Sequence, residues 1–341
     1  MPLLRQVISA PAIAKWLNSG VVTTLAGSGN RASADGTGTD ASFSVPSGIA
    51  ALPNGNLVVC DRDTNRIRLI TPLGVVTTLA GSGTGFADGT GTSAMFNTLL
   101  GIAVLSNGNL VVTDWNNHRI RLITQAGVVT TLAGSGNAAF ADGTGTGASF
   151  NSPRTLAALS NGNIVVADSG NNRIRIVTPL GVVTTLAGSG SIGFADGTGT
   201  AATFNASTGI TELPNGNIAV ADTDNQRIRV VTPLGVVTTL AGNGSGTFAD
   251  GTGTAASFCA PQGLSITPTG MIVLADTNNH RIRLVNPVTG VVTTLAGNVN
   301  GIFADGTGTA ASFKYPCGVA VLPNGKIAVA DTANDRIRLI T

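Results

Sequence analysis

Charged residues are scarce in this sequence, at 11% of 341 residues, and aromatic residues are scarcer, at 4%. Hydrophobic residues make up 43%, which is the opposite of the balance that keeps a chain disordered, so we expect a folded protein. The 19 Lys and Arg nearly cancel the 17 Asp and Glu, and a net charge of +2 is too small to favour nucleic acid as an electrostatic partner. One Tyr and two Trp leave few rings on which the bases of a single strand could stack.

Disulfides, metal centres and membrane spans also lack the residues that they require. The three cysteines, Cys60, Cys259 and Cys317, fall at three different places in the repeat described below, so we expect small buried side chains rather than disulfides. Two histidines, His118 and His280, cannot supply the three protein ligands of a catalytic zinc site. No segment approaches the ~18 consecutive apolar residues of a transmembrane helix. We therefore predict no cofactor, no catalytic or metal-binding residue and no membrane partner.

The first 19 residues stand apart from the rest of the sequence and form an N-terminal extension outside the repeat. Only residues 6–14 separate Arg5 from Lys15, and Pro11 interrupts them, so the segment is a poor signal peptide. Localisation stays open.

An internal repeat of about 54 residues organises residues 20–341. The string GVVTTLAG occurs six times unchanged, ADGTGT occurs six times, and RIR occurs six times. The GVVTTLAG copies begin at Gly20, Gly74, Gly127, Gly181, Gly235 and Gly290. One unit copied along the chain predicts a single domain of six repeats.

Each repeat carries the signals of four short strands, here named a to d. In one unit, strand a is predicted at Gly48–Leu52 and is followed by Asn54-Gly55, a pair typical of a two-residue hairpin turn. Strands b, c and d are predicted at Asn56–Cys60, Arg66–Thr71 and Val75–Leu79, from their apolar and β-branched residues. Four antiparallel strands repeated six times predict an all-β protein, a six-bladed β-propeller.

The phase of the repeat predicts how the ring closes. The first copy, Val21–Gly27, is a d strand with no a, b or c strand before it, and the last copy, Arg336–Thr341, is a c strand with no d strand after it. An open solenoid would leave both as unprotected edges. We therefore expect the N-terminal d strand to join the C-terminal a–b–c strands in one blade.

The a–b–c portion of all six units resembles the NHL repeat, a family of six-bladed propellers. The resemblance rests on Pro46-Ser47-Gly48-Ile49-Ala50, on the turn Asn54-Gly55-Asn56, and on Asn116-Asn117-His118-Arg119-Ile120. The ADGTGT element is similar to the d–a loop of NHL repeats in larger multidomain proteins. The histidine of the motif is kept only as His118 and His280. The resemblance implies several functions, because family members include interaction platforms, RNA-binding domains and a metal-dependent lyase branch, and fold alone does not choose among them.

Most of the charged residues repeat with the blades, which favours a structural role. An Asp that ends strand b precedes by five positions the Arg that begins strand c, so we expect the two to pair across one hairpin. These predicted pairs are Asp61–Arg66, Asp114–Arg119, Asp168–Arg173, Asp222–Arg227, Asp276–Arg281 and Asp331–Arg336. The alternative is a cationic ring on one face, which the neighbouring carboxylates would weaken.

The repeated ADGTGT loop admits two interpretations. Asp and Thr oxygens are ligands that Ca²⁺ accepts, but the loop offers one carboxylate per unit and Asp-Gly is an ordinary turn pair. We therefore favour a structural turn that packs the Phe that follows it. The regularly spaced Phe residues are predicted to be core.

Residues that break the symmetry are the candidates for function. Trp115, Arg62, Asp63 and Asp224 lie in predicted b–c loops, where an exposed indole would make a contact anchor. Glu212, the single Glu of the sequence, lies on an innermost strand and is a candidate for lining the channel or for tipping into solvent at the rim.

The long d–a loops and the b–c loops share one face of a propeller, and long loops on a rigid scaffold are common recognition sites. We therefore predict a monomeric, non-enzymatic binding or scaffold module that holds a protein or small ligand on this face. Two alternatives are a six-bladed hydrolase or lyase, which lacks its metal ligands here, and an RNA-binding NHL domain, disfavoured by the low charge.

Overall fold

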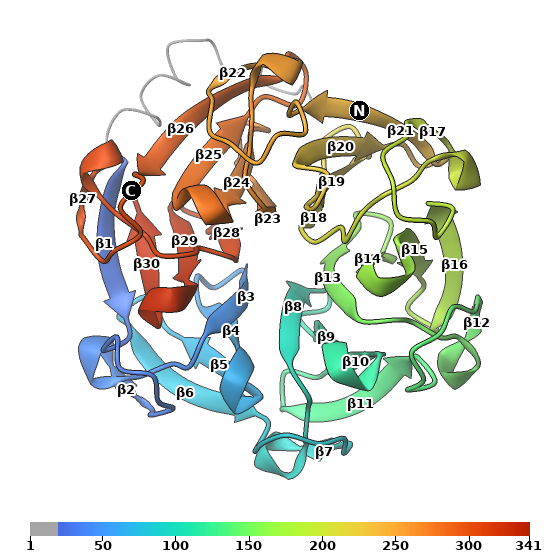
Figure 1. Cartoon of the computed structure of the whole chain (residues 1–341). Helices are drawn as coiled ribbons and strands as arrows, with labels where there is room; N and C mark the ends of the chain where they lie inside the picture. The colour runs from blue at the N-terminus through green and yellow to red at the C-terminus, as the bar shows by residue number, and fades with distance from the viewer. Residues whose placement is uncertain (1–19) are drawn as a thin grey trace, which may run out of the picture.

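The computed structural model describes residues 20–341, so the predictions for residues 1–19 lie outside the described part of the chain. Six antiparallel sheets stand around a central channel, as Figure 1 shows. Blades 1 to 6 are numbered by the order of their innermost strands along the chain. The six-bladed all-β propeller predicted from the repeat is confirmed.

Strands a to d of every blade are present where the repeat predicts them, within two residues. The a strands are β3 (Pro46–Ala51), β8 (Leu99–Val104), β13 (Pro153–Ala158), β18 (Ile210–Glu212), β23 (Pro261–Ile266) and β28 (Val319–Val321). The b strands are β4 (Leu57–Asp61), β9 (Leu110–Asp114), β14 (Ile164–Asp168), β19 (Ile218–Asp222), β24 (Ile272–Asp276) and β29 (Ile327–Asp331). The c strands are β5 (Arg66–Ile70), β10 (Arg119–Ile123), β15 (Arg173–Val177), β20 (Arg227–Val231), β25 (Arg281–Val285) and β30 (Arg336–Ile340). The d strands are β6 (Val75–Ala80), β11 (Val128–Ala133), β16 (Val182–Ala187), β21 (Val236–Ala241), β26 (Val291–Gly297) and β1 (Val21–Ala26).

A fifth strand of two residues completes each blade, which the prediction of four strands missed. These strands are β2 (Gly36–Thr37), β7 (Gly89–Thr90), β12 (Gly143–Thr144), β17 (Gly197–Thr198), β22 (Gly251–Thr252) and β27 (Gly306–Thr307). Each is the Gly-Thr of ADGTGT and pairs with the outer d strand of the blade that follows, as in Gly36↔Val76. A Gly-Thr pair has little intrinsic preference for a strand, so tertiary contacts impose the conformation.

Short 3-10 helices occupy the d–a and b–c loops, which share one face of the ring, here called the loop face. The opposite face carries the a–b and c–d turns and is called the turn face. One set follows the fifth strands: η1 (Gly38–Asp40), η3 (Gly91–Ser93), η5 (Gly145–Gly147), η7 (Gly199–Ala201), η8 (Gly253–Ala255) and η10 (Gly308–Ala310). The other set fills b–c loops: η2 (Arg62–Thr64), η4 (Trp115–Asn117), η6 (Ser169–Asn171), η9 (Thr277–Asn279) and η11 (Thr332–Asn334).

The ring closes between its two ends, as the phase of the repeat predicts. The N-terminal strand β1 lies between β30 and β27, with Val22 opposite Ile340 on one side and opposite Gly306 on the other. In Figure 1 the blue β1 completes the red sheet of blade 6. The closure protects the edges that an open array would expose.

The core lies between neighbouring blades rather than inside any one of them. Phe96, at the entry to blade 2, is fully buried and packs with Val58, Cys60 and Ile67 of blade 1. Equivalent phenylalanines fill the other junctions: Phe43, Phe150, Phe204, Phe258 and Phe313. Every b strand is buried along its whole length, so each blade is held from both sides.

A hydrogen bond between side chain and backbone ties each blade to the next and explains a position that tolerates four residue types. His118 lies just after η4 and its Nδ1 accepts the backbone N–H of Ser152 at 3.0 Å. Asp335 of blade 6 accepts the N–H of Val45 of blade 1 at 2.7 Å, so the same bond crosses the closure. The other members of the set are Asn65, Asn172, Gln226 and His280. What these residues share is an acceptor atom, so both histidines serve the scaffold.

Candidate binding face

The six predicted Asp–Arg pairs are wrong in the identity of the arginine. Asp61 and Arg66 do face one another in the strand register, but the Asp61 carboxylate binds Nη1 of Arg68, two residues further on, at 3.0 Å. The five other predicted pairs fail in the same way: Asp114–Arg119, Asp168–Arg173, Asp222–Arg227, Asp276–Arg281 and Asp331–Arg336. The observed partners are Arg121, Arg175, Arg229, Arg283 and Arg338.

Burial explains why each Asp pairs with the second arginine of RIR rather than with the first. Arg175 is fully buried, as is Asp168, and a buried carboxylate needs a buried counter-charge. Arg173 instead lies half-buried over the ring of Phe140, with its guanidinium 3.8 Å from the ring centre, and donates to the carbonyl of Ser189 at 2.6 Å. Burial raises the pKa of Asp168, while hydrogen bonds and Arg175 act to lower it.

The Asp of ADGTGT binds the same buried arginine from the other side. Asp142 accepts from Nη2 of Arg175 at 2.7 Å and from the backbone N–H and hydroxyl of Thr185 at 3.2 and 3.1 Å. An ion pair with a buried arginine therefore holds each repeated loop against its blade. This structural contact explains why the loop carries an Asp, and no metal is needed to explain it. The equivalent acids are Asp35, Asp88, Asp196, Asp250 and Asp305.

The expectation that all regularly spaced Phe residues are core holds for only one of each pair. Phe150 is fully buried, whereas Phe140 is 44% exposed and stands between Arg173 and Arg175. Alternating arginine and phenylalanine thus form a cation–π stack on the loop face of the blade. The partner of Phe43 is missing, and the Ser33 hydroxyl in its place accepts from Arg66 at 2.8 Å.

The inner strands define the mouth of the channel on the loop face. The residues equivalent to Ser47, at or just before the start of each inner strand, form a ring of six side chains that differ from blade to blade: Ser47, Leu100, Arg154, Thr208, Gln262 and Cys317. The residue that follows each of them is glycine in five blades and Thr155 in blade 3. A Cβ at Gly48 would collide with the carbonyl of Leu100, so glycine lets neighbouring inner strands approach closely.

The side chains directly below this ring are apolar: Ile49, Ile102, Leu156, Ile210, Leu264 and Val319. A cavity of about 250 Å³ continues toward the opposite face, and there Thr211 and Ser265 are also among the lining residues.

Arg62, Asp63 and Asp224, three of the four residues predicted to bind a partner, lie in b–c loops of the loop face. Asp224 is exposed, and Arg62 binds Asp63 at 3.2 Å, with each side chain more than a third exposed. Trp115 is half-buried on η4 rather than freely exposed. At the positions equivalent to Arg62 and Trp115, a Ser or Thr hydroxyl donates to a carbonyl of the next blade, as Thr223 does to Pro261. The equivalent donors are Ser169, Thr277 and Thr332.

The prediction that Glu212 lines the channel is wrong. Its carboxylate accepts from the backbone N–H and the hydroxyl of Ser160, at 2.7 and 2.8 Å, in the a–b turn of the neighbouring blade. The residue thus joins blades 3 and 4 at the turn face. Ser160 alone offers both donors, its N–H and its hydroxyl, and a carboxylate that accepts two hydrogen bonds is favoured over one left against an apolar wall.

Arg154 is the mouth residue that sequence reasoning missed. Its side chain makes no hydrogen bond or ion pair with any part of residues 20–341, while its backbone carbonyl accepts from Thr113 at 2.9 Å. The signal was present in the sequence, since Arg154 occupies a place held by Ser, Leu, Thr, Gln or Cys in the other blades. Burial lowers the pKa of Arg154.

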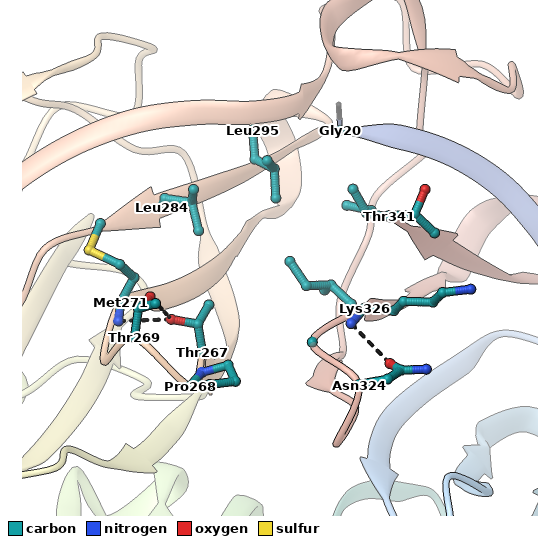
Figure 2. A pocket seen from close by; sticks show the side chains of 13 residues that line it. Gly20, Thr267, Pro268, Thr269, Met271, Leu284, Leu295, Asn324, Lys326 and Thr341 are labelled. Carbon is teal, nitrogen blue, oxygen red and sulfur yellow. Dashed lines mark hydrogen bonds between the residues drawn. The ribbon is translucent and has the colours of Figure 1, made fainter. Parts of the chain in front are cut away.

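A second cavity, of about 260 Å³, lies on the opposite face between blades 5 and 6, and Figure 2 shows it. Met271, Leu284 and Leu295 form its apolar wall, and Gly20 and Thr341 meet beside it at the closure. The Thr267 hydroxyl at its edge already accepts from the Met271 N–H at 3.0 Å. The Lys326 amine points away from the cavity.

Nowhere in residues 20–341 do three or more His, Cys, Asp or Glu side chains gather closely enough to hold a metal ion. Within the same range, no helix has the length and apolarity needed to cross a bilayer.

Sequence comparison finds NHL repeats in four blades of the chain, with the NHL repeat model matching residues 43–68, 96–121, 150–177 and 258–283. The protein SUPPRESSOR OF QUENCHING 1, chloroplastic, of Arabidopsis thaliana is 32% identical over 75% of this chain. NHL repeat-containing protein 2 of Bos taurus is 28% identical over 84% of it. The chain spans 26% of the first relative and 45% of the second, so each relative extends well beyond the matched region.

Solved structures support the fold. An auxiliary nutrient binding protein from Bacteroides ovatus superposes with a TM-score of 0.72 at 19% identity, covering 94% of this chain and 76% of its own. A gluconolactonase from Xanthomonas campestris superposes with a TM-score of 0.64 at 14% identity, covering 98% and 93%. At these identities the likeness shows the fold alone.

Proposed function

Because the chain is an NHL-repeat six-bladed β-propeller, we propose that it is a non-enzymatic binding or scaffold module. Its partner, a protein or a small ligand, binds the face that carries the d–a and b–c loops, at the mouth of the channel. The chain acts as a monomer, and binding needs no metal.

This proposal rests on where the side chains that differ between blades are located. The repeated charged side chains pair with one another inside the blades, since each buried arginine binds two carboxylates of its own blade. The side chains that differ from blade to blade gather at the mouth: Arg62, Trp115, Arg154, Asp224 and Gln262. A rigid ring that presents one irregular surface is the arrangement expected for recognition.

Trp115 is the proposed anchor. It replaces a residue that elsewhere bonds the next blade, so its indole has no counterpart in the symmetric scaffold. Trp is among the residue types most enriched where a few side chains supply most of the binding energy of an interface. The proposed contact surface extends from Trp115 to Arg62 and Asp224.

The test begins with a screen of small metabolites and peptides against the purified chain, followed by hydrogen–deuterium exchange on each binder. We expect protection of the b–c loops and of the first residues of the inner strands, and no effect of a chelator on affinity. Trp115→Ala should weaken binding at least tenfold, whereas Leu180→Ala, an 85% exposed residue of the turn face, should not. A footprint confined to the turn face, or turnover of a binder that a chelator abolishes, would overturn the proposal.

A further inference from the structure

Arg154 lies on an innermost strand, and its guanidinium has no hydrogen-bond or ion-pair partner within residues 20–341. Every other arginine in residues 20–341 has a hydrogen bond or an ion pair through its side chain. Arg154 extends from β13, on the channel wall of blade 3, and is only part-exposed. A cation that is partly removed from water and unpaired retains a strong preference for an anion.

Arg154 belongs to β13, which packs against the inner strands β8 of blade 2 and β18 of blade 4, so the residue stands at the wall of the channel. Groups of three other blades also influence the pKa of Arg154: Cys317 of blade 6, Asp224 of blade 4 and Arg62 of blade 1. Neither Asp224 nor Arg62 lies within ion-pair distance of it.

The remaining residues of the ring decide what could join Arg154 in holding a ligand. The Thr208 hydroxyl is shared with Thr223 at 2.6 Å, and the Ser47 hydroxyl donates to the Leu99 carbonyl at 3.0 Å. Leu100 is apolar. The amide of Gln262 makes no hydrogen bond within residues 20–341 and is only part-exposed. Two long side chains with unused donors therefore lie on one ring, in blades 3 and 5.

We propose that Arg154 and Gln262 bind the carboxylate group of a small organic acid in the mouth of the channel, with its apolar part over the aliphatic walls below. This inference rests on the proposed binding function and names the chemistry of its ligand. The planar guanidinium matches a carboxylate with two parallel hydrogen bonds, and the Gln262 amide supplies a third donor.

The charge balance at the mouth selects a monoanion. The charge of Arg62 is shared with Asp63 at 3.2 Å, so Arg154 provides the uncompensated cation. Asp224 adds a negative charge nearby, which opposes any anion and disfavours a dianion such as phosphate most. The apolar wall formed by Ile102, Leu156 and Leu264 suits a hydrocarbon or aromatic body.

The experiment titrates the purified chain with benzoate and hexanoate, with benzamide and hexanamide as neutral matches, and with inorganic phosphate. Binding is measured by calorimetry and by NMR shifts of the arginine side-chain N–H groups. We expect the acids to bind at least tenfold more tightly than the amides and more tightly than phosphate. Arg154→Gln should remove this preference, and Asp224→Asn should strengthen acid binding severalfold.

Two controls keep the outcomes distinct. Arg154→Gln removes no hydrogen bond, so its melting temperature should match that of the parent chain. Lys326→Gln deletes an exposed cation of the turn face and should leave acid binding unchanged. Equal affinity for acids and amides, tighter binding of phosphate, or an acid preference that survives Arg154→Gln would overturn the inference. If a screened partner still protects the loop face in that event, the proposed function stands and only the carboxylate site fails.

Discussion

The buried arginine of each blade permits a sharp test of how the scaffold is held. Asp168→Ala removes the 2.6 Å ion pair with Arg175 and also the acceptor for the Asn151 N–H and the Asn171 amide, at 2.9 Å each. Arg175 keeps Asp142, whose side chain is 47% exposed and screened by water. Stranding one member of a buried pair costs on the order of 3–5 kcal/mol, so we expect a loss of that size in the free energy of unfolding.

The assay is a double-mutant cycle by urea denaturation followed by circular dichroism. Asp168→Ala combined with Arg175→Met should show a coupling of roughly 2 kcal/mol or more, because the charges are in contact. Asp168→Ala combined with Arg173→Met should be additive within about 0.5 kcal/mol, because Arg173 binds loop carbonyls and Phe140 instead. A larger coupling with Arg173 than with Arg175 would refute the reasoning. Should Asp168→Ala fail to fold, Asp168→Asn serves in both cycles.

Two further predictions concern the junctions between blades. His118→Leu deletes the acceptor for the Ser152 N–H and should cost about 1–3 kcal/mol by urea denaturation. His118→Asn keeps an acceptor, as Asn65 and Asn172 do in two other blades, and should cost less than half as much. Burial, followed by the charge of Arg119, lowers the pKa of His118 in the folded chain. Near the ordinary histidine pKa of about 6.5 the unfolded chain therefore binds more protons, and stability should fall as pH drops through that value. A stability profile against pH that is the same in the parent chain and in His118→Asn would contradict this. Deleting residues 1–27 removes β1 and exposes the edge of β30, so the truncated chain should aggregate or swap strands, and a monomer of unchanged melting temperature in sedimentation and calorimetry would show that closure is not needed.

The fold was predictable because the same local sequence signals occur in six copies. Asn54-Gly55, the apolar b strand and the β-branched d strand each carry a local signal, and the phase of the copies determines the closure. The fifth strand was not predictable from local signals, because Gly36-Thr37 becomes a strand only through its contact with Val75 and Val76.

The site was less predictable, since it depends on which side chain reaches which neighbour. Strand register correctly opposes Asp61 and Arg66, yet the ion pair goes to Arg68, because burial and not register decides where a guanidinium is needed. Glu212 bonds Ser160 across a blade junction that no spacing within one unit encodes. Arg154 could have been found by comparing the six copies position by position, as its mismatch with Ser47 and Gln262 is visible in the sequence.

The most direct test of the central claim is to ask which face a partner touches. A photo-crosslinking amino acid is placed at Asn278, an exposed b–c loop residue outside the proposed contact set, and separately at Leu180 on the turn face. Each variant is illuminated with a partner that binds the parent chain, and the crosslinked peptides are identified by mass spectrometry. The account predicts crosslinks from position 278 and none from position 180. Crosslinks from position 180 alone would contradict it and move recognition to the turn face.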